Sequence, residues 1–265
     1  MKSRTLASAA IFTAFVAAAT SVFTINIPAT QGYFNVGEIM VYTSALLMGP
    51  YVGAFAGGVG SAISDLLVPA PYYAPGTLVI KGIEGFVVGY LGTRTFPKVT
   101  RAGWRGITLG FGLVFSLSLA YVGSVFLSGD FAITLGGAWN IPAYNFDLQV
   151  PQLFWPLLGT VGFVIIALFA TRVEVKSGQS IMSVLVGGSE MVAGYYLYES
   201  LVLTLIAPAS IVATLAPAAE VPFNVAQALI GLLVAVPLAR SIKRITRGRG
   251  LWSSSTEVSS GSTEQ

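Results

Sequence analysis

The sequence predicts an all-α integral membrane protein, a polytopic helical bundle of about eight transmembrane helices. Apolar residues make up 54% of the 265-residue chain and charged residues only 9%, which leaves too little polar surface to cover a soluble globule of this size. Eight apolar runs are candidates for crossing the roughly 30 Å hydrocarbon core. Thirteen of the fourteen lysines and arginines fall between or beyond these runs.

The first run begins after Lys2 and Arg4, and the second is short. In chain order the runs are Leu6–Ile27, Met40–Met48, Tyr51–Val68, Thr77–Thr93, Gly106–Leu127, Leu153–Thr171, Ile181–Ile206 and Val221–Ala239. An alternative for the first run is a cleaved signal peptide, because a basic start, an apolar run and Ala17-Ala18-Ala19 resemble one. Its removal would leave seven crossings.

The positions of the basic residues predict the topology. If the N-terminus is cytoplasmic, eight crossings place every basic residue except Lys81 on the cytoplasmic side, as the positive-inside rule requires. We therefore expect a multi-pass protein of the cell membrane with both termini cytoplasmic. Residues 1–249 form the membrane domain, and residues 250–265, rich in Ser, Thr and Glu, form a disordered cytoplasmic tail. The net charge of +3 then needs no nucleic acid as a partner.

Composition also limits the chemistry. The chain has no cysteine and no histidine, which excludes thiol catalysis, disulfides, haem ligation and the usual zinc sites. The acidic residues show no paired motif at metal-ligand spacing, and no Gly-x4-Gly-Lys-Ser/Thr string is present. We therefore predict no metal, no cofactor, no enzymatic activity and no ATPase site in this chain. An intramembrane enzyme that uses carboxylates is a weaker alternative.

Lys81 and Glu84 lie inside the fourth apolar run. An ion pair in a membrane is costly unless it is buried in the bundle or faces a wet cavity, so it marks a candidate functional site. At i, i+3 the two side chains share one helix face and can pair with each other or with a polar solute. Asp65 is a possible second partner for Lys81. The alternative is a static pair that only fixes helix packing.

The predicted outer loops carry further candidates for ligand binding. Tyr33, Asn35 and Glu38 lie between the first two runs, and Tyr73 lies in a proline-rich stretch, residues 69–77, that would suit a lid. The alternatives are interfacial anchoring for the aromatic residues and helix capping for Glu38.

The last two runs add polar groups. Tyr195 and Glu199 are one turn apart in the seventh run, and Glu199 is a better ligand candidate than Glu190, which lies nearer the cytoplasm. In the eighth run Pro222 suits a first helical turn, and Asn224 and Gln227 share a face. These two amides can read donors and acceptors on a heterocycle, or they can simply bind each other.

Two stripes of small residues favour close helix packing. The first, Ala10, Ala14 and Ala18, lies in the first run and suits either internal packing or contact with another protein. The second, Gly49, Gly53, Gly57 and Ser61, is predicted to pack internally.

Four strings together resemble the substrate-binding S component of an energy-coupling factor (ECF) transporter, closest to the riboflavin-transporter-like S components. They are GYFNVGEIM, ALLMGPYVGAFAGGVGSAISDLL, YAPGTLVIKGIEGFVVGYLG and EVPFNVAQALIGLLVAVPLAR, and they cover Gly32–Gly92 and Gly187–Arg240. The resemblance implies a six-helix core, and relative to it the region of about residues 104–172 is an insert of two further helices.

The resemblance implies a function as well. Such proteins capture a vitamin or related micronutrient at the outer face and work with a transmembrane coupling protein and two cytosolic ATPases. It assigns Asn224 to substrate contact, and Ala10 and Ala14 to docking on the coupling protein. Glu38 stands where the family often has aspartate. The expected ligand is a flavin-like or pyrimidine-like heterocycle. The alternative function is an autonomous ion-coupled secondary transporter of a small polar solute, although the two halves show no convincing inverted repeat.

Overall fold

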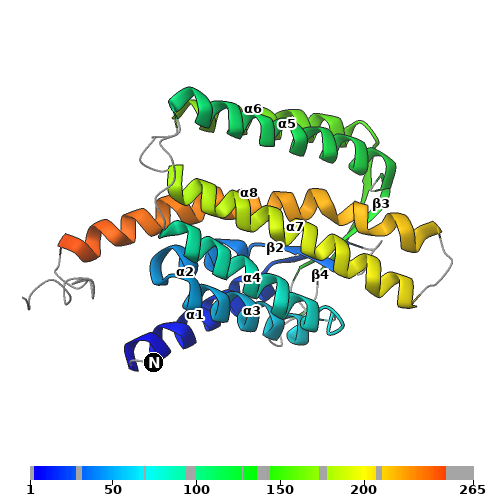
Figure 1. Cartoon of the computed structure of the whole chain (residues 1–265). Coiled ribbons are helices and arrows are strands. Elements are labelled where there is room, and N and C mark those ends of the chain that lie inside the picture. The colour runs from blue at the N-terminus through cyan, green and yellow to red at the C-terminus, as the bar shows by residue number, and fades with distance from the viewer. Residues whose placement is uncertain are drawn as a thin grey trace, which may run out of the picture.

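The computed structural model describes residues 3–27, 32–68, 70–93, 100–126, 128–135, 142, 144–172, 178–206 and 211–248. In these segments the chain forms eight α-helices and two antiparallel β-hairpins (Figure 1). The helices are α1 Ser3–Val22, α2 Glu38–Met48, α3 Pro50–Leu67, α4 Ala74–Gly92, α5 Arg101–Phe126, α6 Phe154–Arg172, α7 Gly178–Ile206 and α8 Ile211–Gly248. The hairpins are β1 Thr24–Ile27 with β2 Gly32–Asn35, and β3 Gly129–Leu135 with β4 Tyr144–Val150.

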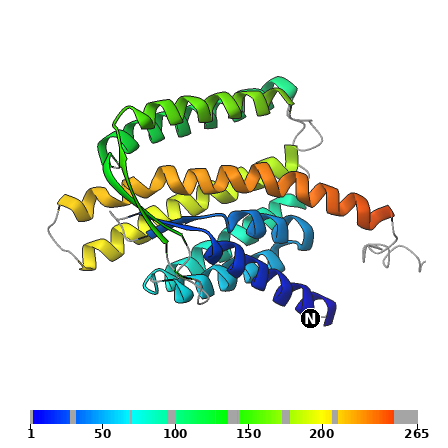
Figure 2. The ribbon, with the colours of Figure 1, turned by 180° about the vertical axis from the view of Figure 1, so that it is seen from behind.

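The helices are arranged in layers. Helices α1 to α4 lie on one side, α7 and α8 lie across the middle, and α5 and α6 lie side by side along the opposite side (Figures 1 and 2). The first residues of α1 and the last residues of α8 lie toward the same side of the molecule in both views. This agrees with an even number of crossings. The orientation in the membrane stays a prediction, and the predicted tail, residues 250–265, lies outside the described residues.

The eight helices fall where the apolar runs predicted them, with two corrections. The first run was expected to stay helical to Ile27, but α1 ends at Val22 and the chain turns into β1. The eighth helix begins at Ile211, so Pro222 lies inside α8 and not in its first turn. Proline is tolerated within a membrane helix where neighbouring groups satisfy the freed carbonyl. Proline often marks the first turn of a helix, but Pro222 does not do so here.

Length and composition identify three described helices that can cross a membrane, through the segments Thr5–Val22, Arg101–Val125 and Glu220–Thr246. Glu38–Met48 and Phe154–Leu168 are apolar but shorter. Helices α3, α4 and α7 carry buried acidic or basic side chains, which lowers their apolar character. The structure is therefore the predicted helical membrane bundle, and the number of eight crossings stays a prediction.

Glycines allow α3 and α4 to approach closely. A Cβ atom at Gly53 would lie 2.7 Å from the carbonyl oxygen of Gly85, and one at Gly57 would lie 2.7 Å from the carbonyl oxygen of Lys81. Because no side chain larger than hydrogen fits there, the two backbones are in direct contact. The predicted packing role is confirmed for Gly53, Gly57 and Ser61, whereas Gly49 joins α2 to α3 with a φ of 83°.

The buried apolar residues form a main core and smaller clusters. The main core joins α1, α2, α3, α4, α7 and α8 and the start of α5, where Trp104 is buried; Val16, Tyr42, Val88 and Val184 are all 1% exposed or less. A second cluster joins α5 and α6 through residues that include Phe115, Leu119 and Trp155. The α5–α6 pair thus has an apolar contact surface of its own, against which residues of α8 such as Phe223 and Leu229 pack.

Candidate functional site

Lys81 is the centre of a buried network of charged groups. Its Nζ atom donates hydrogen bonds to Glu38 Oε1, at close contact, and to Glu84 Oε2 at 3.1 Å. Tyr42 donates to Glu84 Oε1 at 2.7 Å. The predicted Lys81–Glu84 pair is therefore present. Its second partner is Glu38, at the first position of α2, and not Asp65.

Asp65 pairs instead with the hairpin. The Tyr33 hydroxyl of β2 donates to Asp65 Oδ1 at 2.5 Å and lies 3.4 Å from Ser64 Oγ. Burial raises the pKa of Tyr33 well above its ordinary value, and the neighbouring Asp65 carboxylate raises that pKa further. Tyr33 therefore keeps its proton near neutral pH and remains a hydrogen-bond donor. The contact ties β2 to α3.

Tyr195 brings α7 to the same place. Its hydroxyl donates to Thr77 Oγ1 at 3.0 Å, and Lys81 Nζ lies 5.4 Å from its ring centroid. This distance is within the range of a cation–π interaction. Tyr195 thus presents both a hydroxyl group and an aromatic face next to the charged network.

The two amides of α8 are both buried and bind each other. Gln227 Nε2 donates to Asn224 Oδ1 at 3.0 Å. Gln227 Oε1 receives no hydrogen bond within the described residues. The predicted shared face is confirmed, and the mutual bond still leaves an acceptor available on Gln227.

These groups enclose a small polar cavity of about 30 Å³. It lies between the β1–β2 hairpin and helices α1, α3, α4, α7 and α8. Its lining residues are Thr20, Gly32, Tyr33, Asn35, Ser61, Asp65, Tyr73, Thr77, Lys81, Tyr195, Glu220, Asn224 and Gln227. Eight of the predicted binding residues are in this set, since only Glu38, Glu84 and Glu199 are not. Asn35 also has a structural task, because its Oδ1 accepts the Gly37 N–H at 2.8 Å before α2.

The sequence reasoning did not select Glu220 as a site residue. This carboxylate on α8 accepts hydrogen bonds from the Gly32 backbone N–H and from Tyr73, and it lies against Glu199 of α7. Glu220 precedes Asn224 by four residues, so it lies on the same helix face. That spacing would have identified it. Glu199 is 1% exposed and contacts this group without lining the cavity itself.

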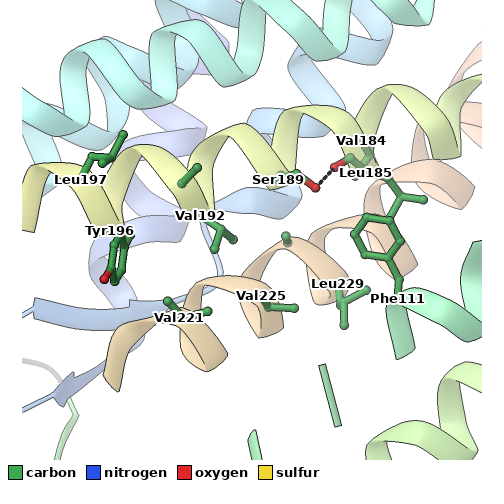
Figure 3. Close-up of a pocket in the computed structure, with 13 residues that line it drawn as sticks. Phe111, Val184, Leu185, Ser189, Val192, Tyr196, Leu197, Val221, Val225 and Leu229 are labelled. Carbon is green, nitrogen blue, oxygen red and sulfur yellow. Dashed lines mark hydrogen bonds between the residues drawn. The ribbon is translucent and has the colours of Figure 1, made fainter. Parts of the chain in front are cut away.

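Larger cavities have a different character. One of about 430 Å³ lies between α7 and α8, with Phe111 of α5 at one end (Figure 3). Figure 3 shows mainly aliphatic and aromatic side chains around it, and Ser189 is already bonded to the Leu185 carbonyl at 2.8 Å. Another, of about 340 Å³, lies between α8 and the α5–α6 pair and is also apolar. Neither offers convergent polar groups, so the small polar cavity is the candidate site.

The alanine stripe of α1 faces away from the bundle. Ala10 and Ala14 are exposed and Ala18 is half-buried, whereas Ala9 and Val16 on the opposite face are buried. This position does not agree with internal packing for Ala10 and Ala14, and contact with another protein stays a prediction.

Comparison with known proteins gives a family and one relative. The family model for ECF-type riboflavin transporter S components matches this chain over two overlapping stretches, residues 1–161 and 146–244. A protein of Pyrococcus woesei, described as an uncharacterized protein in a gap 3' region, is 46% identical over 112 residues, which are 40% of this chain and 72% of the relative. No solved structure matches the chain significantly.

Proposed function

Because the chain belongs to the family of ECF-type riboflavin transporter S components, we propose that it captures a vitamin or related micronutrient at the outer face of the cell membrane for ATP-driven uptake by partner subunits. As a member of that family it is a membrane-embedded, substrate-binding transporter subunit and not an enzyme. The proposal concerns the site, the ligand and the partners.

The observation that carries the proposal is the convergence of buried polar side chains on one cavity. Lys81, Asp65, Tyr195 and Asn224 come from four different helices, and Tyr33 comes from the hairpin. Buried polar groups in a membrane protein are costly and mark substrate pathways. The arrangement of aromatic rings, amides and charged groups suits a small polar heterocycle, in agreement with the flavin-like or pyrimidine-like ligand expected from the sequence.

The partners in this proposal are those of an ECF module, a transmembrane coupling protein and two cytosolic ATPases. The exposed Ala10 and Ala14 on α1 are the proposed docking surface, with Ala18 at its edge. Small residues let a partner helix approach closely.

The test is mass spectrometry of small molecules released from the detergent-purified protein, followed by titration of any compound found. Asn224→Ala is expected to weaken binding by roughly 1 to 3 kcal/mol, the cost of losing a buried hydrogen bond. The matched control is Gln149→Ala, an amide removed from the exposed strand β4. Unchanged affinity in a folded Asn224→Ala protein would contradict the assignment of the site.

An autonomous ion-coupled transporter is separated from this function by uptake into vesicles that also contain the ECF partners. If uptake stops when the ATPases are inactivated, the protein is a capture subunit. Uptake that continues and follows an ion gradient would contradict the proposal.

A further inference from the structure

We infer that the apolar cavity between α7 and α8 holds one hydrocarbon chain of a membrane lipid, which enters from the outer leaflet in the predicted topology. This cavity is separate from the polar site, so the inference does not depend on which vitamin the protein captures. It requires only that the chain is embedded in a bilayer, as its family and its apolar helices show.

The lining of the cavity favours an apolar occupant. Among the described residues the lining has two side-chain hydroxyl groups, those of Ser189 and Tyr196, and no amide or charged side chain (Figure 3). Ser189 already donates to the Leu185 carbonyl at 2.8 Å. A vitamin with several polar atoms would lose its hydrogen bonds to water here without replacing them. A hydrocarbon chain has no such bonds to lose.

The cavity is elongated along the helices. Its lining residues recur every three or four positions from Leu185 to Tyr196 on α7, and every four positions from Val221 to Leu229 on α8. Residues with this spacing form a row along the helix axis. The row on α7 is about 16 Å long at 1.5 Å per residue, close to half of the roughly 30 Å hydrocarbon core. Length and direction therefore suit a chain that spans one leaflet.

The two ends of the cavity differ. The ring of Phe111 lies at one end, near Leu185, and Tyr196 lies at the other (Figure 3). In the predicted topology α7 runs outward, so Tyr196 is nearer the outer face. Tyrosine is favoured at a membrane interface, where its ring is in apolar surroundings and its hydroxyl meets the headgroups. Tyr196 thus marks the entrance, and Phe111 marks the place of the chain end.

The cavity is continuous with a surface that faces lipid. Ser189, Ala193 and Leu197 line it, recur every four residues on α7 and are exposed. Leu201 and Leu205 continue the same row beyond the cavity and are 58% and 72% exposed. In a membrane protein a row of exposed leucines is covered by lipid chains. The same chains can therefore reach the cavity from the side without crossing water.

A helix of a partner protein is too large for this space. A helix about 10 Å wide and as long as the row on α7 would occupy roughly 1,300 Å³, about three times the cavity volume of about 430 Å³. A single hydrocarbon chain is much narrower, because its carbon atoms pack about 4 Å from their neighbours.

The experiment is photolabelling of the full-length protein in phosphatidylcholine vesicles. A small fraction of the lipid carries a diazirine at the end of one acyl chain, and peptide mass spectrometry locates the labelled residues. We expect Leu185, which is only partly exposed, to be labelled at least as strongly as Val114 of α5, which is 69% exposed. Labelling of Val114 without labelling of Leu185 would overturn the inference, because only the surrounding lipid would then be in contact with the protein.

A variant that fills the cavity tests the position of the chain. Ala193→Trp is expected to lower labelling of Leu185 by at least about tenfold, because the larger ring takes the space of the chain, and to leave Val114 labelled. The control is Val186→Trp, at an exposed position of α7 outside the lining, which should change neither. If Ala193→Trp does not fold, Val225→Phe fills the same cavity from α8 and should have the same effect. Unchanged labelling of Leu185 in a folded variant of either kind would contradict the inference.

Discussion

At the scale of single residues, Lys81 joins α4 to α2 by sharing one positive charge between Glu38 and Glu84. All three side chains are 4% exposed or less. A buried pair contributes little net stability when complete, but it becomes very unfavourable when one partner is lost, because the remaining charge has no compensation. The ion network therefore fixes the relative position of α2 and α4 more than it raises the free energy of unfolding.

Replacement of Lys81 tests this directly. Lys81→Met is expected to lower the free energy of unfolding by about 3 to 5 kcal/mol, because it leaves two buried carboxylates facing each other. The measurement is an unfolding titration in mixed detergent micelles. Lys243→Met, which removes a lysine from the exposed end of α8, is the control and should have little effect. Adding Glu38→Gln and Glu84→Gln to Lys81→Met should recover much of the loss; no recovery would show that packing and not charge is responsible.

At the scale of elements, the close contact of α3 and α4 places Lys81 and Asp65 on the same cavity. The contact depends on Gly53 and Gly57, where a Cβ atom would approach the carbonyl oxygens of the facing helix to 2.7 Å. A backbone carbonyl group cannot move aside as easily as the end of a flexible side chain. The geometry of the site therefore depends on residues that do not touch it.

Gly53→Ala is accordingly expected to destabilise the protein by about 1 to 3 kcal/mol through overpacking and to weaken ligand binding. The matched control is Gly110→Ala in α5, where a Cβ atom would meet nothing within 4 Å and alanine should gain up to about 1 kcal/mol from its helix propensity. The check is the same unfolding titration for both variants. Equal free energies of unfolding for the two variants would mean that α3 and α4 can move apart to make room for the methyl group without loss of stability.

Helix α1 combines a buried face and an exposed face of small residues, which gives a second prediction at this scale. Ala14→Trp is expected to leave folding and ligand binding unchanged, since Ala14 is exposed, and to reduce uptake strongly by blocking the approach of a partner helix. Ala102→Trp, at the exposed start of α5, serves as the control. Normal uptake by Ala14→Trp would show that this face of α1 is not part of the docking surface.

The sequence located the helices well because apolar runs long enough for a membrane are a strong signal. It was less informative where tertiary contacts decide. The pair Lys81–Glu84 is visible at i, i+3, but Glu38 is 43 residues away from Lys81 and meets it only through helix packing. The β1–β2 hairpin was not predicted either, since its loop position and aromatic residues suited interfacial anchors equally well. Pro222 suggested a helix start, although α8 continues through it.

At the scale of the whole molecule, the candidate site is almost closed. Its cavity of about 30 Å³ is roughly the volume of one water molecule, whereas sites for small organic ligands usually measure about 300 to 1,000 Å³. Parts of the lining must therefore move apart before a vitamin can enter. The main core joins residues of seven of the described helices, while the hairpin contributes only two short strands, so we expect the hairpin to move.

The contacts that hold the hairpin on α8 include a ring pair and a hydrogen bond, and the ring pair can be replaced by a reversible covalent link. The Phe34 and Phe223 rings meet edge to face with centroids 6.4 Å apart, and Glu220 accepts the Gly32 N–H. Because the chain has no cysteine, Phe34→Cys with Phe223→Cys provides a unique pair for a cleavable bifunctional reagent. We expect the linked protein to lose binding of the ligand identified by mass spectrometry, and to regain it when a reductant cleaves the link. Each single cysteine variant treated with the reagent is the control and should still bind. Full binding by the linked protein would mean that the ligand enters between helices, without movement of the hairpin.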